Sequence, residues 1–469
     1  MWVAFRDEVS LVETPGEQVR LETPWARVIV SAPGPGLVAA LRTLATGHAT
    51  ADELADLVLA QDEDPAALYY QLRRCADLRL LCYSVVAAGG PLATLVPMAP
   101  GFELLASPVD ARARFRLSRF AYCRRDADAI VVESPLSATR TTLNPAGVAL
   151  VAALAQPRTA QELAKRVDGL TEDDAAAFLG LLASARLAAA VTDGGELDED
   201  RQAPLAQWDF HDLLFHTRSR QGRHDYPYGG TFRSLGTFDP LPAVKPRMAE
   251  DVVALYRPPL DQLAREDVSL TRALETRRSI REYGDPPISV RQLGEFLYRV
   301  AAVRQLTEPD RARDRHYTIS RRAYPSAGAA HDLELYLTVN GCVGLAPGLY
   351  HYDPLEHQLG RLTGPNAETE GLLRDARQAA LMASPPQVLV TIASRFQRLS
   401  WKYTSMAYAA TLKNVGVLYQ TMYLVATAMG LAPCALGGGN ADRFAAAVGS
   451  DYFAESSVGE FILGSAPPP

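Results

Sequence analysis

Three arginines and a serine occur within five positions, in the run Arg277, Arg278, Ser279, Ile280 and Arg281. Guanidinium groups hold a phosphate through paired hydrogen bonds, and a serine hydroxyl with free backbone amides completes such a site. The simpler interpretation is a solvated cluster at a helix end. On its own, the run therefore indicates a phosphate site without requiring one.

A second motif, Pro325, Ser326, Ala327 and Gly328, follows further along the chain. Gly and Ala carry little side chain, so the backbone of such a turn can lie close to a flat ligand. Taken singly, the motif is more often an ordinary turn. Together with the arginine run, it predicts a site for a planar, phosphorylated cofactor.

Composition excludes several classes of protein. The chain has 469 residues and a net charge of -7, which argues against a general nucleic-acid binder. None of its five cysteines forms a Cys-x-x-Cys pair, so we expect no metal site and a reducing, cytoplasmic location. No basic apolar leader opens the chain, and no apolar run reaches the ~18 residues of a membrane span, so we expect neither export nor membrane contact.

The residues around the two motifs predict an α+β domain over 261–469. Apolar periodicity predicts helices at 270–277, 289–302 and 366–382, and strands at 333–339, 349–352, 387–393 and 458–464. A single long helix over 400–429 is apolar on nearly every face. Such a helix should be buried in a large core or in a subunit interface.

The first part of the chain predicts two winged-helix-like units, 1–100 and 110–195. Each shows three short helices and a strand, with Thr50 or Thr159 placed to cap the second helix. The third helix of the second unit, 172–184, contains no Lys or Arg, which favours peptide recognition over DNA binding.

Strand-like runs at 27–31 and 129–133 are candidate edge strands for an added peptide. Residues 196–260 are expected to be a linker and a segment that wraps a surface.

Four motifs now point to a family. Residues 277–283, 324–329, 348–352 and 436–439 occur in the order found in nitroreductase-like flavoproteins. More narrowly, the chain resembles the SagB-type peptide dehydrogenases, also called azoline oxidases, over roughly residues 208–469. The resemblance implies FMN-dependent oxidation of thiazolines or oxazolines to thiazoles or oxazoles in a ribosomally made precursor peptide. It also implies a homodimer, a leader peptide on the substrate, and a cyclodehydratase that makes the azoline.

The resemblance assigns a role to each motif. The residues expected to bind FMN are Arg277, Arg278, Ser279 and Arg281 at the phosphate and ribityl chain, Pro325, Ser326, Ala327 and Gly328 along the isoalloxazine, and Gly437 and Gly438 near flavin N5. Asn414 either bonds the flavin or pairs across the dimer. Many relatives close the phosphate site with basic residues near the C-terminus, which this chain lacks. Either the three arginines suffice, Arg443 replaces the missing charge, or the phosphate is held more weakly.

The catalytic candidates are Lys402 and Tyr403, which we place at the start of the long helix. In the azoline oxidases a Lys-Tyr pair at the matching place is associated with catalysis. A tyrosine hydroxyl beside an ammonium gives up its proton more easily, and a desolvated lysine can itself act as a base. Composition alone favours a solvated lysine and a core tyrosine. The choice of base stays open between the two residues.

Two other functions compete with azoline oxidation. One is a nitroreductase-like reduction of small molecules by NAD(P)H, which would not need a peptide-binding front end. The other is a catalytically silent scaffold that binds a precursor peptide. Both enzymes should contain bound flavin, whereas the scaffold should not. The two enzymes differ in what bleaches the flavin: NADPH for the small-molecule reductase and an azoline peptide for the azoline oxidase.

Overall fold

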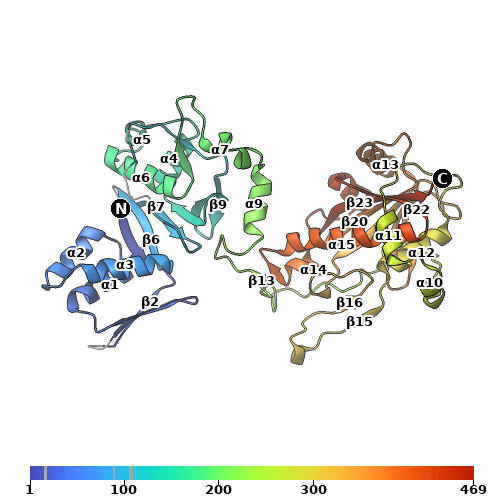
Figure 1. Ribbon diagram of the computed structural model, residues 1–469, viewed down its shortest axis with the longest axis horizontal. Coiled ribbons are helices and arrows are strands. Elements are labelled where there is room, and N and C mark those ends of the chain that lie inside the picture. The colour runs from blue at the N-terminus through green and yellow to red at the C-terminus, as the bar shows by residue number, and fades with distance from the viewer. Residues whose placement is uncertain (15–17, 88–89, 105–108, 111, 469) are drawn as a thin grey trace. The chain divides into compact units, whose positions relative to one another are not determined.

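Two units make up the described part of the chain, which the computed structural model gives as residues 1–14, 18–87, 90–104, 109–110 and 112–468. The first spans Met1–Tyr226 and the second Pro227–Pro469 (Figure 1). The expected boundaries at 1–100, 110–195, 196–260 and 261–469 stay predictions, and some residues of the first, second and fourth segments lie outside the described ranges.

The N-terminal unit mixes short helices with antiparallel strands. Its strands are β1 (Trp2–Phe5), β2 (Ser10–Thr14), β3 (Gln18–Glu22), β4 (Arg27–Ser31), β5 (Ala49–Thr50), β6 (Leu81–Ala87), β7 (Gly90–Pro97), β8 (Phe115–Leu117), β9 (Tyr122–Asp126), β10 (Ala129–Glu133), β11 (Thr139–Leu143) and β12 (Ala188–Ala190). Its helices are α1 (Pro35–Thr46), α2 (Ala51–Leu59), α3 (Ala66–Asp77), α4 (Pro145–Ala153), α5 (Ala160–Ala164), α6 (Glu172–Ser184), α7 (Asp198–Arg201), α8 (Ala203–Ala206) and α9 (Phe210–Arg218).

The helix caps predicted in this unit are confirmed. Thr50 begins α2 and Thr159 begins α5, and in each case the threonine and a glutamate three residues later form a capping box. Such reciprocal bonds satisfy backbone donors that the first turn of a helix leaves free. Local sequence therefore determines where these helices start.

The sheets of this unit correct one prediction. A seven-stranded sheet runs in the order β5-β1-β6-β7-β11-β10-β9, so the pairing of β7 with β11 joins the two expected winged-helix units. Strand β4 lies at the edge of the separate sheet β2-β3-β4, as an added peptide would require. Strand β10 pairs with a strand on both sides, so the expectation that 129–133 forms an edge strand was wrong.

The C-terminal unit carries both sequence motifs. Its strands are β13 (Gly229–Gly230), β14 (Val252–Ala254), β15 (Gln305–Thr307), β16 (Ile319–Arg321), β17 (Leu333–Val339), β18 (Gly348–Asp353), β19 (Gln358–Thr363), β20 (Val388–Arg395), β21 (Tyr403–Thr404), β22 (Leu431–Leu436) and β23 (Glu455–Ser465). Its helices are α10 (Leu260–Glu266), α11 (Leu270–Thr276), α12 (Val290–Ala301), α13 (Ala367–Ala380), α14 (Gln397–Ser400), α15 (Ala407–Ala428) and α16 (Ala441–Val448), with 3-10 turns η1 (Arg311–Arg313) and η2 (Ala327–Ala329). The α+β class is confirmed.

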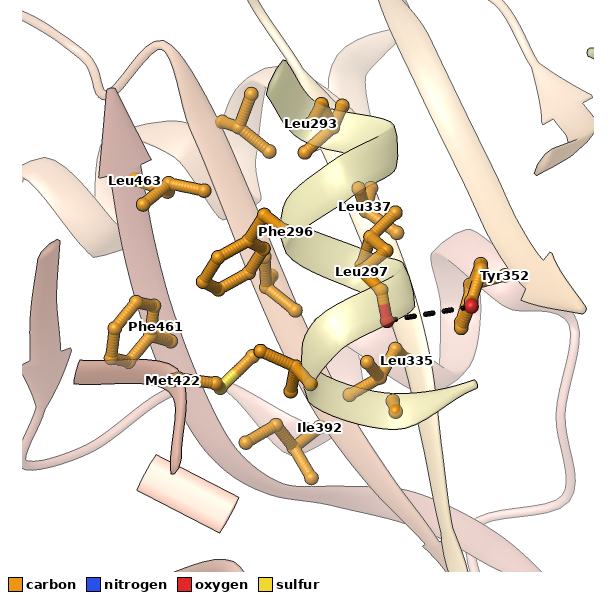
Figure 2. Packing of buried hydrophobic residues seen from close by; sticks show 14 of the residues in the cluster. Leu293, Phe296, Leu297, Leu335, Leu337, Tyr352, Ile392, Met422, Phe461 and Leu463 are labelled. Carbon is orange, nitrogen blue, oxygen red and sulfur yellow. Dashed lines mark hydrogen bonds between the residues drawn. The ribbon is translucent and has the colours of Figure 1, made fainter. Parts of the chain in front are cut away.

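A seven-stranded antiparallel sheet in the order β14-β19-β18-β17-β20-β23-β22 forms the centre of this unit. Side chains alternate between the faces of a strand, so Leu335 and Leu337 pack in one core with α12 and α15, while Tyr336 packs in another with α13 and α16. Figure 2 shows Phe296 of α12 among the buried side chains of the first core. Helices therefore cover both faces of the sheet.

The segment that opens this unit, around residues 238–242, contacts the chain from the end of β20 to the start of β21. The Arg395 Nη1 donates to the Pro242 carbonyl oxygen at 3.0 Å, and the Trp401 Nε1 donates to the Phe238 carbonyl oxygen at 2.7 Å. These bonds hold an irregular segment in place through its backbone carbonyls. Residues 229–232, nearer the start of the same segment, bond directly to the backbone of 402–404.

The described residues offer neither a metal cluster nor a membrane-spanning helix. No group of three or more His, Cys, Asp or Glu side chains there could hold a metal ion. Within the same residues, no helix is long and apolar enough to cross a membrane.

Candidate active site

Lys402 and Tyr403 lie in an extended segment, which corrects their predicted place at the start of a helix. The expected helix over 400–429 is divided into α14 and α15, with β21 between them. Tyr403 pairs with Gly230 of β13, and the Phe232 backbone N–H donates to the Lys402 carbonyl oxygen at 3.0 Å. Ser405, with a φ of 63°, is left-handed and cannot continue a helix. Long-range pairing therefore replaces the local helical preference.

Aromatic rings and a hydroxyl surround the Lys402 ammonium. Its Nζ lies 5.0 Å from the ring centroid of Tyr403 and 5.4 Å from those of Tyr317 and Phe232. It also donates to the Tyr317 hydroxyl oxygen at 3.2 Å. Cation–π contacts and hydrogen bonds of this kind favour the charged ammonium.

The balance of these effects determines the charge of Lys402. Burial lowers its pKa, but the hydrogen bonds and charge interactions with Tyr317 and Tyr403 outweigh burial and raise the pKa above its usual value of 10.5. At neutral pH the side chain is an ammonium. It can stabilise negative charge there, but it has no free lone pair with which to accept a proton.

Gly328 brings the predicted turn and the predicted catalytic pair together. Its φ is 58°, and a Cβ at this position would lie 2.7 Å from the hydroxyl oxygens of Tyr317 and Tyr403 and 2.9 Å from the Lys402 Nζ. The Tyr317 hydroxyl donates to the Gly328 carbonyl oxygen at 2.8 Å. Only glycine combines this backbone conformation with this close approach. The turn and the pair therefore form one site.

Asn414 of α15 holds the same turn from the other side. Its Nδ2 donates to the Ser326 hydroxyl at 3.0 Å and to Asp332 Oδ1 at 2.7 Å, and its Oδ1 accepts from the Ala327 backbone N–H at 3.2 Å. The amide thus bonds within the chain through both its nitrogen and its oxygen. The structure gives Asn414 a positioning role, and a direct bond to a cofactor stays a prediction.

The arginine run follows α11 and contacts the far part of α15. The Arg277 guanidinium lies 5.1 Å from the ring centroid of Tyr423, whose hydroxyl is 2.7 Å from the Ser279 Oγ. Arg278 and Arg281 are exposed. Asn414 and Tyr423 are nine residues apart on one helix, which corresponds to about 13 Å along its axis. The two halves of the predicted cofactor site therefore contact different stretches of α15.

The remaining candidates lie at the end of β22. Gly437 and Gly438 are exposed, and a Cβ built on either would meet no atom within 4 Å. Their backbone is therefore open to a ligand. Tyr423 also bonds to this strand, because its hydroxyl accepts from the Ala435 backbone N–H at 2.8 Å.

Arg443, one expected substitute for the missing basic C-terminus, pairs with acidic residues. Its Nη1 is 3.2 Å from Glu368 and its Nε is 3.1 Å from Asp375. Both acidic residues lie on α13, so the guanidinium is neutralised where α16 meets α13. Arg443 therefore already has two acidic partners, and its use as the missing phosphate charge stays a prediction.

Sequence reasoning missed three residues of the site. Tyr317, Phe232 and Tyr423 lie outside the motifs, and each contacts a motif residue. Tyr317 had one weak signal, because it precedes β16 and the Pro-Ser-Ala-Gly turn closely. Nothing local distinguished Phe232 or Tyr423 from other aromatic residues.

Three family models match the chain in succession. The ThcOx helix turn helix domain matches residues 1–105, the cyanobactin oxidase ThcOx matches 115–225, and the nitroreductase family matches 274–464. The chain is an oxidoreductase, and its residues 274–464 match the nitroreductase family. The two matches that precede this domain are those of cyanobactin oxidases, which confirms the predicted relationship to nitroreductase-like peptide oxidases and supports azoline oxidation as the reaction class.

Individual relatives match the same domain. A protein of Methanocaldococcus jannaschii named as a nitroreductase is 28% identical over 187 residues, which cover 40% of this chain and 85% of the relative. The E. coli microcin synthetase McbBCD complex, solved with truncated pro-MccB17 bound, contains a chain that is 21% identical, with a TM-score of 0.33 and coverage of 50% of this chain and 91% of that one. A nitroreductase from Desulfovibrio desulfuricans, solved with FMN, is 15% identical, with a TM-score of 0.28 and coverage of 43% and 88%.

Proposed function

We propose that this oxidoreductase is an FMN-dependent dehydrogenase that converts thiazolines or oxazolines in a ribosomally made precursor peptide to the aromatic azoles. The observation that carries the proposal is the Lys402 ammonium beside Tyr403, both lying against Gly328 of the predicted cofactor turn. Aromatisation removes a proton and a hydride from the ring, so it needs a base next to a hydride acceptor. FMN, when bound, would accept the hydride.

Tyr403 is our candidate for the base. As a phenolate, Tyr403 would take the proton from the ring carbon next to the carbonyl group. The Lys402 ammonium, 5.0 Å from the Tyr403 ring, would stabilise that form. The raised pKa of Lys402 supports this division of roles, since a lysine that stays protonated cannot be the base. Tyr317 would hold the Lys402 Nζ in place through its hydroxyl.

The cofactor site is proposed from chemistry that fits FMN. Arg278 and Arg281 offer exposed guanidiniums for the phosphate, with Arg277 and Ser279 beside them. The open backbone at Gly437 and Gly438 and the turn from Pro325 to Gly328 would lie along the flat ring.

A homodimer would explain the exposed face of α15. Tyr408, Leu412 and Val417 are 48%, 39% and 38% exposed on this helix, where apolar side chains gain from burial. A second copy packed there would bring its own motifs to the site. We expect Leu412→Asp to convert a dimer to a monomer in light scattering, while Leu381→Asp, at a position 92% exposed and outside α15, leaves the mass unchanged.

The front end is proposed to bind the leader of the substrate. The edge strand β4 supports this role, since an extended peptide can add to a free strand edge. A cyclodehydratase would supply the azoline, and the reaction would take place in the cytoplasm.

The test uses purified protein supplied with FMN, an azoline peptide and NADPH. We expect a yellow protein whose flavin absorbance is bleached under anaerobic conditions by the azoline peptide and not by the same peptide before ring formation. Bleaching by NADPH alone would instead indicate a small-molecule reductase. A protein that binds no FMN would point to a scaffold and overturn the proposal.

A further inference from the structure

A cleft of about 550 Å³ lies next to the Gly328 turn. Residues of β15 and β16 form part of its wall, and Pro325, Ser326 and Ala329 of the turn form another part. Because these residues flank Gly328, the cleft adjoins the Lys402 and Tyr403 pair through one short segment. A ligand in the cleft would therefore lie close to the reacting groups.

Three buried polar side chains line this cleft without using all of their hydrogen-bonding capacity. Ser320, Arg322 and His331 are 3%, 8% and 2% exposed. Their Oγ, Nε and Nδ1 atoms have no hydrogen-bond partner within the described part of the chain. Buried polar groups are usually paired, and leaving them unpaired is unfavourable. A ligand that pairs with them would remove that cost.

The chemistry of these groups suits an uncharged amide. Arg322 Nε is a donor, and Ser320 can donate or accept. Burial, together with the charges of Arg322 and Arg398, lowers the pKa of His331 to about 3, so its ring is neutral and one of its nitrogens is an acceptor. A peptide group offers one carbonyl acceptor and one N–H donor, which matches this set.

The strands beside the cleft also favour an extended peptide. Strands β15 and β16 form a two-stranded sheet, with no third strand paired to it in the residues that the structure describes. On β16 the Ser320 backbone already bonds to His331, so β15 is the strand whose outer edge is left without a partner strand there. Extended peptides bind to such edges through main-chain hydrogen bonds.

We propose that this cleft binds the backbone of the substrate peptide next to the ring being oxidised. Arg322 Nε donates to a peptide carbonyl oxygen, and Ser320 Oγ or His331 Nδ1 accepts from a peptide N–H. The inference rests on the proposed azoline oxidation, and it identifies the part of the substrate that this site recognises.

The test compares Ser320→Ala and Arg322→Met with the matched control Arg311→Met, which changes an exposed arginine outside the cleft. With FMN-loaded enzyme and an azoline peptide, we expect KM to rise about two- to tenfold for Ser320→Ala and about ten- to hundredfold for Arg322→Met. The control should match the wild type. A small azoline without flanking peptide groups should show the same KM in all four proteins.

Several outcomes would overturn the inference. Ser320→Ala removes an unpaired hydroxyl, so misfolding does not obscure its result, and an unchanged KM for the peptide refutes the cleft as its site. Loss of flavin absorbance in either variant would assign the cleft to the cofactor instead. If the wild type oxidises no azoline, the proposed function fails, and the cleft is judged by fluorescence anisotropy of a labelled azoline peptide: equal affinity for wild type and Ser320→Ala refutes it.

Discussion

Replacing Lys402 by arginine and by methionine separates its two possible roles. Arginine keeps a positive charge but cannot release a proton at accessible pH, whereas methionine has no charge. If Lys402 stabilises a deprotonated Tyr403, Lys402→Arg should keep much of the turnover and Lys402→Met should lose it. If Lys402 is the base, both variants should be equally inactive.

The size of the charge effect follows from the geometry. Over the 5.0 Å from the Lys402 Nζ to the Tyr403 ring centroid, two unit charges at an effective dielectric of ~20 interact by about 3 kcal/mol. Both side chains are partly exposed, so solvent screening weakens the interaction energy, to about 1.5 kcal/mol where screening is strongest. Lys402→Met should therefore lower kcat by about ten- to 150-fold.

The assay is single-turnover bleaching of bound flavin by an azoline peptide. Lys165→Met, at an exposed lysine that follows α5, serves as the control and should react as the wild type. Because the pKa of Lys402 is raised above 10.5, no rate increase from its deprotonation should be seen below that pH. Two results together would refute the assignment of Tyr403 as base. Lys402→Arg would be as inactive as Lys402→Met, and the rate of the wild type would keep rising above pH 10.5.

Three further predictions concern the residues that shape the site. Gly328→Ala should abolish turnover of the azoline peptide, because the new Cβ would clash with the Tyr317 and Tyr403 hydroxyls. A left-handed non-glycine residue also costs about 1–2 kcal/mol. Wild-type activity of this variant would contradict the prediction. Asn414→Leu should lower the free energy of unfolding in urea by about 2–4 kcal/mol, because it leaves the buried Asp332 without one of its partners; an unchanged midpoint would contradict it. The pKa of His331 is lowered to about 3, so the folded state binds fewer protons than the unfolded state, and stability should fall as pH drops from 6.5 toward 3. His331→Gln should flatten that dependence in unfolding experiments at pH 4 and 7, and an equal slope in both proteins would count against it.

Local patterns predicted most of the C-terminal fold. Strand β17 was predicted at 333–339 and observed as Leu333–Val339, because its apolar run is buried on both faces of the sheet. Helix α12 was predicted at 289–302 and lies at Val290–Ala301, since its apolar stripe and the Ser289 cap are both visible in sequence. These features depend on neighbours a few residues away.

The break before α15 could not be predicted in the same way. The apolar pattern of the long helix predicts a start at residue 400, although 400–406 contains Ser400, Thr404 and Ser405, which favour a helix only weakly. The chain instead pairs with Gly229 and Gly230, far away in sequence, and Ser405 turns it with a positive φ. Long-range backbone pairing outweighed helix propensity, which is weak for any single residue.

Residue types and their order along the chain specify the motifs: an arginine run, a Pro-Ser-Ala-Gly turn, a Lys-Tyr pair and a glycine-rich loop, in an order that predicts a nitroreductase-type oxidase. Which of these motifs lie together depends on the folded chain. It brings Lys402 and Tyr403 to Gly328, adds Tyr317 and Phe232, and puts the arginine run against another stretch of α15. Motifs follow from residue type and spacing, whereas the charge and contacts of Lys402 depend on side chains that only folding brings together.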